Sequence, residues 1–204
     1  MTARIDYYTF MISPWAYLGS ARLEAIAAKH KAEVRIIPME AAGVFPVSGG
    51  LPLAQRAKQR QAYRLMELAR WRDYLGVPIN FQPKHFPAPD GLAARLVIAA
   101  RDGGQNAIKL AHAIMRAAWA EERNIADADT LKQIAAEAGL DGAALLALAE
   151  QPAAKAALTQ GTEQAIAAQV FGAPSYVFDG EIFWGQDRLD FLDRALARKG
   201  GSLP

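Results

Sequence analysis

The fold is decided by residues 7–18, which read Tyr7-Tyr8-Thr9-Phe10-Met11-Ile12-Ser13-Pro14-Trp15-Ala16-Tyr17-Leu18. The apolar run before Ser13 is typical of a β-strand, and the residues after it have helical spacing. Proline is well tolerated as the first residue of a helix, because that position needs no amide donor. The stretch therefore predicts a strand, a tight turn and a helix with Ser13 at its start. Ser13 is either a plain helix cap or part of an anion site, because helix N-termini attract anions such as thiolates.

The elements around this stretch predict a βαβ unit. Arg4 to Met11 is the first strand, the helix runs from Pro14 to about Lys31, and Glu33–Pro38 is a second strand that stops at proline. Strands joined by a helix of this length lie parallel. The next segment, residues 43–52, is rich in glycine and proline and is expected to be a long loop.

The middle of the chain has helical spacing, and the β pattern returns after Gly172. One long basic helix is expected over residues 53–75, and further helices over 91–103, 105–122, 127–138, 141–150 and 152–170. Residues 174–184 form a hairpin around the pair Asp179-Gly180, followed by a helix from Leu189 to about Lys199. The two β-containing ends must pair with each other. The prediction is an α/β protein with a discontinuous sheet domain, residues 1–42 and 171–204, and an inserted helical domain, residues 43–170.

Composition excludes several classes of function. A formal net charge of +2 does not favour nucleic acid, and no stretch is long and apolar enough for a membrane span. The chain has no cysteine, so it forms no disulfide and performs no dithiol chemistry of its own. Its three scattered histidines predict no metal site. With no signal peptide apparent, a cytoplasmic protein is expected.

Two further segments could meet Ser13. Ala173-Pro174 precedes a strand, where a cis peptide bond would leave the backbone of Ala173 free to pair with an extended peptide. Gly185-Gln186-Asp187-Arg188 opens the last helix. Asp187 could cap that helix, and it could also bind an ammonium group.

Together these motifs resemble the 2-hydroxychromene-2-carboxylate isomerases of the thioredoxin superfamily, which are related to kappa-class glutathione transferases and periplasmic dithiol oxidases. The resemblance spans nearly the whole chain. It is carried by residues 12–18 and by Leu68-Ala69-Arg70-Trp71, Val170-Phe171-Gly172-Ala173-Pro174 and Phe183-Trp184-Gly185-Gln186-Asp187-Arg188. It implies a thioredoxin-like sheet domain with a helical insert, which is the order of elements read above.

The resemblance also implies glutathione as cofactor and a set of binding residues. Ser13 would hydrogen-bond the glutathione sulfur, as a donor and not as a nucleophile. Ala173, before a cis-Pro174, would pair with the cysteinyl backbone, while Gln186 and Asp187 would hold the γ-glutamyl end. A lysine early in the long helix approaches a carboxylate in the family, and here either Lys58 or Arg60 could take that place.

The implied reaction is cis–trans isomerisation of a small aromatic pyruvate by reversible addition of the glutathione thiolate. The substrate carboxylate needs a cation, and four basic residues lie at helical spacing: Arg56, Lys58, Arg60 and Arg64. A solvated basic face is the alternative for each of them. The sequence departs from the family at Trp15, usually tyrosine, and at Thr9, often acidic, and both changes concern the substrate.

Two alternative functions share the fold. One is a kappa-like glutathione transferase or peroxidase acting on another electrophile, and the other is a non-catalytic binding protein. Relatives of this kind are commonly dimers, so a homodimer is expected. Four large side chains at helical spacing are expected in the core: Met66, Trp71, Met115 and Trp119.

Overall fold

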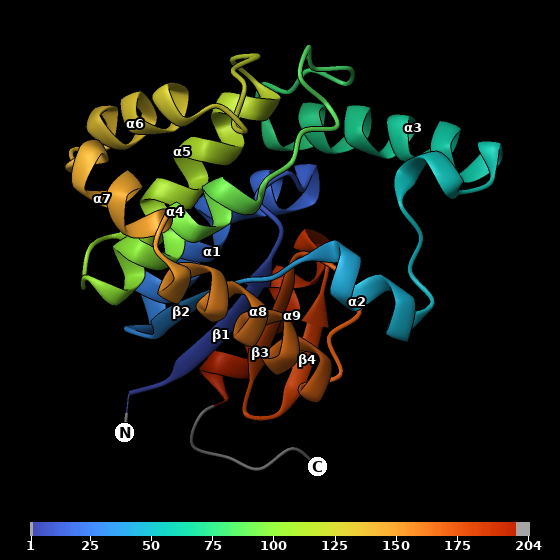
Figure 1. Ribbon diagram of the computed structural model, residues 1–204. Helices are drawn as coiled ribbons and strands as arrows, with labels where there is room; N and C mark the ends of the chain where they lie inside the picture. The colour runs from blue at the N-terminus through green and yellow to red at the C-terminus, as the bar shows by residue number, and fades with distance from the viewer. Residues whose placement is uncertain (1, 199–204) are drawn as a thin grey trace.

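A computed structural model describes residues 2–198, and its centre is a four-stranded mixed sheet (Figure 1). The strands are β1 (Arg4–Thr9), β2 (Glu33–Pro38), β3 (Ser175–Phe178) and β4 (Glu181–Trp184), in the spatial order β2-β1-β3-β4. β1 and β2 are parallel, whereas β3 is antiparallel to both β1 and β4. The predicted pairing of the two ends of the chain is confirmed, since Tyr7 faces Ile36 in β2 and Tyr176 in β3.

The two faces of the sheet pack against different helices, because successive side chains of a strand point to opposite sides. On one face, Ile5 and Tyr7 join a core that includes side chains of α1 (Pro14–His30) and α9 (Leu189–Ala197). On the other, Tyr8 and Ile37 pack with residues of α2 (Ala41–Ser48) and α8 (Pro152–Ala167). Both faces of β1 are therefore covered, and its consecutive residues Tyr7, Tyr8 and Thr9 are all buried.

The helical insert shares the larger of these cores. It contains α4 (Gly91–Asp102), α5 (Ala107–Trp119), α6 (Ala128–Glu137) and α7 (Gly142–Ala149), close to their predicted positions. Leu96, Ile98 and Trp119 belong to the same buried cluster as the strand residues Ile5 and Tyr7. The insert is thus packed onto the sheet domain as one continuous core.

Two predictions about the first part of the insert, residues 43–75, are wrong. Residues 41–48 form the helix α2 and not a loop, although Pro46 lies inside it, because Val44 is fully buried and Phe45 packs edge-on against Phe10. The single helix expected over residues 53–75 is two elements, a 3₁₀ turn at Leu53–Gln55 and α3 (Lys58–Leu75). The backbone between them is extended, and Arg56 is tied there by its Nε, which donates to the carbonyl of Leu51 at 2.8 Å.

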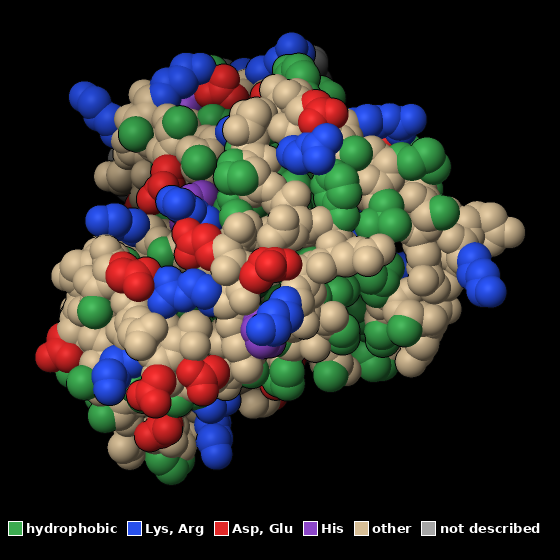
Figure 2. All heavy atoms as spheres, turned by 90° about the horizontal axis from the view of Figure 1, so that it is seen from above, with side chains coloured by type: hydrophobic (Ala, Val, Ile, Leu, Met, Phe, Trp, Pro, Cys, Tyr) green, Lys and Arg blue, Asp and Glu red, His purple; other side chains and the backbone are tan. Residues whose placement is uncertain are grey.

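Helix α3 lies at the periphery of the molecule (Figure 1), and Leu68 is its one fully buried residue among those described. Several of its large apolar side chains are exposed: Tyr63, Leu65, Met66 and Tyr74. The expectation that Met66 is a core residue is therefore wrong, whereas Met115 and Trp119 are fully buried. In the view from above, hydrophobic side chains gather on the side of the molecule where α3 lies, and charges of both signs cover the other side (Figure 2).

The last predicted helix ends within the described part at Ala197; Lys199, with residues 1 and 200–204 of the predicted sheet domain, lies outside the described residues. Among residues 2–198 no helix has the length and apolar character needed to cross a membrane.

Candidate functional site

Ser13 is the N-cap of α1, as one of its two interpretations predicts. Its Oγ accepts a hydrogen bond from the amide of Ala16 at 3.2 Å, and its backbone is extended. The amide of Trp15, the next donor at this helix end, has no partner among the described residues. The hydroxyl proton of Ser13 has a single long contact, 3.5 Å to the carbonyl oxygen of Ala173. At the positive end of this 17-residue helix, the Trp15 amide is therefore unpartnered in the described chain and the Ser13 hydroxyl makes only one long hydrogen bond, which is the local chemistry of an anion site.

The peptide of Ile12, immediately before Ser13, is held from both sides by the helical insert. Its amide donates to the Asp90 carboxylate at 3.1 Å, and its carbonyl accepts from the indole Nε1 of Trp119 at 3.2 Å. Burial raises the pKa of Asp90, although the Ile12 amide works in the opposite direction by favouring the ionised form. The insert therefore fixes the position of the turn that carries Ser13.

Ala173-Pro174 lies next to this turn, and its peptide bond is cis, as predicted. The amide of Ala173 has no hydrogen-bond partner among the described residues, and its carbonyl has only the long contact with Ser13. The carbonyl of Pro174 accepts from the amide of Gly185 at 2.9 Å, which brings the 185–188 turn alongside. The backbone of Ala173 can thus accept an added extended strand.

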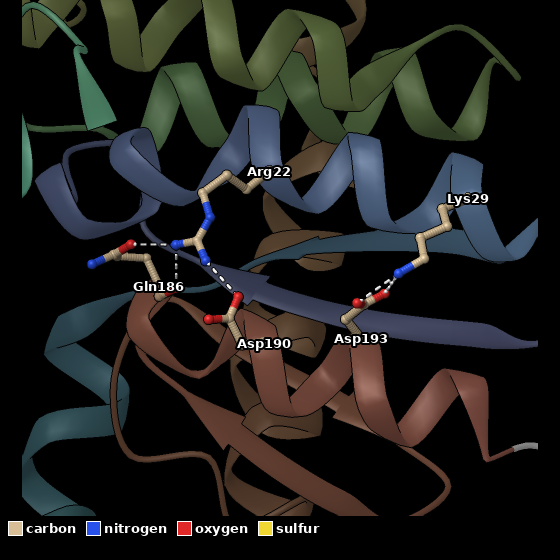
Figure 3. A network of polar contacts seen from close by, with 5 residues as sticks. All are labelled: Arg22, Lys29, Gln186, Asp190 and Asp193. Atoms are coloured by element: carbon tan, nitrogen blue, oxygen red, sulfur yellow. Dashed lines mark hydrogen bonds and ion pairs between the residues drawn. The ribbon is translucent and has the colours of Figure 1, made fainter. Parts of the chain in front are cut away.

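The 185–188 turn is positioned by Arg22 of α1 (Figure 3). The Nη1 of Arg22 donates to the carbonyl oxygen of Gln186 at 3.1 Å and to its side-chain Oε1 at 3.0 Å, and its Nη2 pairs with Asp190. Because a guanidinium only donates, Gln186 must present its oxygen to Arg22. Its amide nitrogen points away from Arg22 in Figure 3 and remains free to donate.

Asp187 does not cap the last helix. Its carboxylate instead pairs with the neighbouring Arg188 at 2.6 Å, and no side chain caps either the 3₁₀ turn over residues 186–188 or α9. Gly185 has a left-handed backbone, with φ of 96°, and a Cβ there would lie 2.4 Å from Asp187 Oδ1. Because glycine has no Cβ, residue 185 leaves room for the Asp187 carboxylate.

A cavity of about 480 Å³ lies between α3 and the turns at residues 173 and 185–188. Its wall combines aromatic rings with charged side chains and the Ala173 turn: Trp15, Arg56, Gln59, Arg60, Tyr63, Arg64, Glu67, Trp71, Ala173, Trp184, Gly185, Gln186, Asp187 and Arg188. An aromatic, partly polar cleft of this size suits a small organic ligand.

The structure brings together most of the residues singled out in the sequence. Ala173, Gln186, Asp187 and Arg60 line the cavity, whereas Lys58 is exposed and does not. Ser13 is almost fully buried next to the cavity-lining Trp15, and its Oγ contacts Ala173. Of the two candidates for the early basic residue, only Arg60 faces the cavity.

The cavity has an excess of positive charge. Asp187 is paired with Arg188, and Glu67 is paired with Arg70, which lies outside the cavity. In the part of the chain that the structure describes, Arg56, Arg60 and Arg64 form no ion pair with a carboxylate. Burial and the neighbouring Arg56 lower the pKa of Arg64 to about 10, so its guanidinium stays charged at neutral pH.

Sequence reasoning missed three residues that position the site: Arg22, Asp90 and the indole of Trp119. Each acts across 78 or more positions of the chain. Helical spacing identifies Trp119 as buried but does not reveal its hydrogen bond. The described residues contain no cluster of histidine and carboxylate side chains that could hold a metal ion.

Comparisons with known proteins show which sequences and folds this chain is similar to. A curated 2-hydroxychromene-2-carboxylate isomerase from Sphingobium xenophagum is 29% identical over 96% of this chain and 99% of its own length. One of the same name from Pseudomonas putida is 29% identical over 95% and 94%. The solved structure of a 2-hydroxychromene-2-carboxylate isomerase superposes with a TM-score of 0.83, at 24% identity, over 96% of this chain and 95% of that one.

The resemblance stated from the sequence motifs is thereby confirmed. The model of the DsbA-like thioredoxin domain matches residues 4–197, nearly the whole chain. The protein therefore belongs to the DsbA-like thioredoxin domain family.

Proposed function

We propose that this protein is a glutathione-dependent isomerase that interconverts the cis and trans forms of a small aromatic pyruvate, as in 2-hydroxychromene-2-carboxylate isomerisation. The observation that carries the proposal is the donor pair at the start of α1, the weakly bonded Ser13 hydroxyl and the Trp15 amide, which has no partner in the described chain, in a protein without cysteine. A site for a thiolate with no thiol of its own calls for a thiol from outside. The names of the relatives support the reaction class.

The residues present fit glutathione. The unpaired amide of Ala173 and its nearly free carbonyl suit the cysteinyl backbone of the tripeptide, which would add like a short strand. The free amide nitrogen of Gln186 suits a carboxylate, and Asp187 suits the ammonium of the γ-glutamyl group. Arg56 and Arg60 are cations without a carboxylate partner in the described chain, and they would hold the glycyl carboxylate.

When bound, glutathione supplies a thiolate that adds reversibly to a conjugated carbon, so that the former double bond can rotate before the thiolate leaves. The chain stabilises that thiolate. Lowering a thiol pKa from about 8.5–9 to about 6.5 takes about 3 kcal/mol. A helix N-terminus contributes about 0.3–1 kcal/mol, and a hydrogen bond to a charged group about 1.5–3 kcal/mol. The Ser13 hydroxyl and the Trp15 amide together are sufficient, without a cationic base.

The substrate end of the cavity supplies orientation. Trp15, Tyr63 and Trp71 offer aromatic surface to a planar ring, and the arginines of α3 offer charge to a carboxylate. Because no histidine or carboxylate hydrogen-bonds Ser13 within the described residues, Ser13 acts as a donor and not as a nucleophile. A reduced, glutathione-containing compartment such as the cytoplasm suits this chemistry.

The proposal is tested by thermal denaturation with millimolar glutathione, followed by an absorbance assay with 2-hydroxychromene-2-carboxylate. Glutathione at 100 times its Kd adds about 2.7 kcal/mol to the free energy of unfolding, which for a chain of this size raises Tm by about 5–10 °C. No shift with glutathione would contradict the proposal. A shift without isomerisation would favour the transferase or peroxidase alternative, acting on another electrophile.

A further inference from the structure

The guanidinium of Arg64 lies against two aromatic rings in the wall of the cavity. Its guanidinium carbon lies 5.5 Å from the centre of the Phe86 ring and 5.6 Å from that of Trp119. The two rings pack on each other at 4.9 Å and form one aromatic platform beneath the cation. A cation stacked on two rings keeps its position and orientation better than an arginine in solvent.

This cation has no carboxylate partner among residues 2–198. Other arginines of α3 are matched, since Arg72 pairs with Asp73 and Arg70 with Glu67. A half-buried charge without a counter-ion is costly, and an anion that enters the cavity would relieve that cost. The planar guanidinium fork favours a carboxylate, which it can bind through two parallel hydrogen bonds.

Arg64 is also connected to the Ser13 turn, unlike the other two unpaired arginines of the cavity. Its platform residue Trp119 donates to the carbonyl of Ile12, the residue before Ser13. Arg56 is tied instead to the loop carbonyl of Leu51, and Arg60 is exposed. An anion on Arg64 therefore lies on the side of the cavity where the reacting sulfur would be held.

We propose that Arg64 is the specificity-determining residue of the site and binds the carboxylate of the acceptor substrate, while glutathione uses the 173 and 185–188 turns with Arg56 and Arg60. The assignment of the reaction rests on the proposed function, but the carboxylate site does not. The substrate class is then conjugated aromatic acids whose reactive double bond lies within a few bonds of the carboxylate. Neutral enones of the same shape fall outside it.

The test measures binding by titration calorimetry with trans-cinnamate and its neutral amide, cinnamamide, and separately with glutathione. We expect the wild-type protein to bind cinnamate at least about tenfold more tightly than cinnamamide, as one charge-assisted carboxylate contact implies. Arg64→Gln should remove this preference and leave the Kd of glutathione within about twofold. Arg64→Lys should keep part of the preference, because it retains the charge but not the fork.

The matched control is Arg72→Gln. Arg72 lies on the same helix and also stacks on an aromatic ring, that of Phe81 at 4.9 Å, but it does not line the cavity. This variant should keep both the preference for cinnamate and the affinity for glutathione. If Arg64→Gln does not fold, Arg64→Lys is used in its place. Because lysine cannot make the bidentate contact, this variant should still show a weaker preference for cinnamate over cinnamamide.

The outcomes separate this inference from the proposed function. The inference is overturned if Arg64→Gln still prefers cinnamate to cinnamamide. It is also overturned if Arg64→Gln binds glutathione tenfold more weakly and cinnamate as before, because Arg64 would then be a glutathione-binding residue. Equal binding of cinnamate and cinnamamide by the wild-type protein also overturns it, even where glutathione binds. Conversely, an Arg64-dependent preference in a protein that does not bind glutathione supports the carboxylate site and contradicts the proposed cofactor.

Discussion

Ser13 has two roles that a single substitution would disturb together. As the N-cap of α1 it stabilises the helix, and as a hydroxyl donor with only one long contact it would stabilise a bound thiolate. Ser13→Ala should lower the free energy of unfolding by about 1 kcal/mol through the lost cap. It should also raise the pKa of the bound glutathione thiol by one to two units and lower kcat/KM about 10- to 100-fold. Thiolate absorbance against pH and steady-state rates measure the two effects.

Asn106→Ala is the control for the cap. Asn106 caps α5 through the amide of Lys109 at 3.0 Å and does not line the cavity. Asn106→Ala should lower the free energy of unfolding by a similar amount and leave the thiol pKa and the rate unchanged. If Ser13→Ala and Asn106→Ala behaved alike, Ser13 would be a helix cap and nothing more.

His112 should make the stability of the protein depend on pH. It belongs to α5 and packs against α1, with its Nδ1 2.5 Å from Ser20 Oγ and its ring stacked on Tyr17. Burial lowers its pKa, and nearby Arg116 lowers it further. In the unfolded chain it takes up a proton near pH 6.5, and in the folded protein at lower pH. The stability it contributes is therefore present above about pH 6.5 and is lost as the pH falls through the folded pKa.

Urea denaturation between pH 8 and pH 5 measures this loss, which is at most about 1.4 kcal/mol per pH unit. His112→Asn should flatten the dependence in that range relative to the wild-type protein. Asp90 has the opposite sign: its pKa is raised, so its contribution is lost as the pH rises. Equal slopes in wild type and His112→Asn would contradict the prediction for His112.

At the scale of elements, the site depends on the contact between α1 and the turn at residues 185–188. Arg22 fixes both the backbone and the side chain of Gln186. Arg22→Met should raise the Kd of glutathione about tenfold with a smaller effect on kcat, since the bound tripeptide loses a preorganised donor. Lys29→Met is the control, because Lys29 joins the same helices through Asp193 without contacting Gln186 (Figure 3). Similar affinities in the two variants would show that Arg22 serves only to join the helices.

The same contact leaves no space for a side chain at Gly19. A Cβ there would lie 2.8 Å from Gln186 Cβ and 2.8 Å from the hydroxyl of Tyr176. Gly19→Ala should therefore destabilise the fold by about 1–3 kcal/mol and weaken glutathione binding by displacing Gln186. Gly91→Ala, whose Cβ would meet only the flexible end of Arg95 at 3.6 Å, should be neutral or slightly stabilising. Calorimetric melting and glutathione titration of both variants check this.

The elements also show what the sequence could predict. Local signals sufficed for β1, α1 and the hairpin, because proline suits the first position of a helix and Asp179-Gly180 tolerates the positive φ angles of a two-residue hairpin turn. They failed for α2, whose glycine and proline argue for a loop while the burial of Val44 favours a helix. They failed again at Met66, because a peripheral helix leaves apolar positions exposed. Arg22 and Asp90 were missed because their roles depend on tertiary contacts that no local pattern encodes.

At the scale of the whole molecule, the two walls of the cavity differ in how firmly they are held. The 173 and 185–188 turns are bonded to the sheet domain, whereas α3 buries one residue of eighteen. In α5, by comparison, eight of thirteen residues are buried. Helices with few buried contacts open locally at low free energy. Helix α3 is therefore the wall that a ligand, or a second copy of the chain, would order.

Hydrogen exchange measured by mass spectrometry tests this difference. Amides of residues 58–75 should exchange at least about tenfold faster than those of α5 in the free protein, and glutathione with cinnamate should slow them in proportion to occupancy, leaving α5 almost unchanged. The measurement is repeated at two protein concentrations, because a homodimer is expected from the sequence and an interface on α3 would cover the exposed Tyr63, Met66 and Tyr74. Protection of α3 that rises with protein concentration supports the dimer. Protection of α3 equal to that of α5 in the dilute, ligand-free protein would contradict the prediction that α3 is the less stable wall of the cavity.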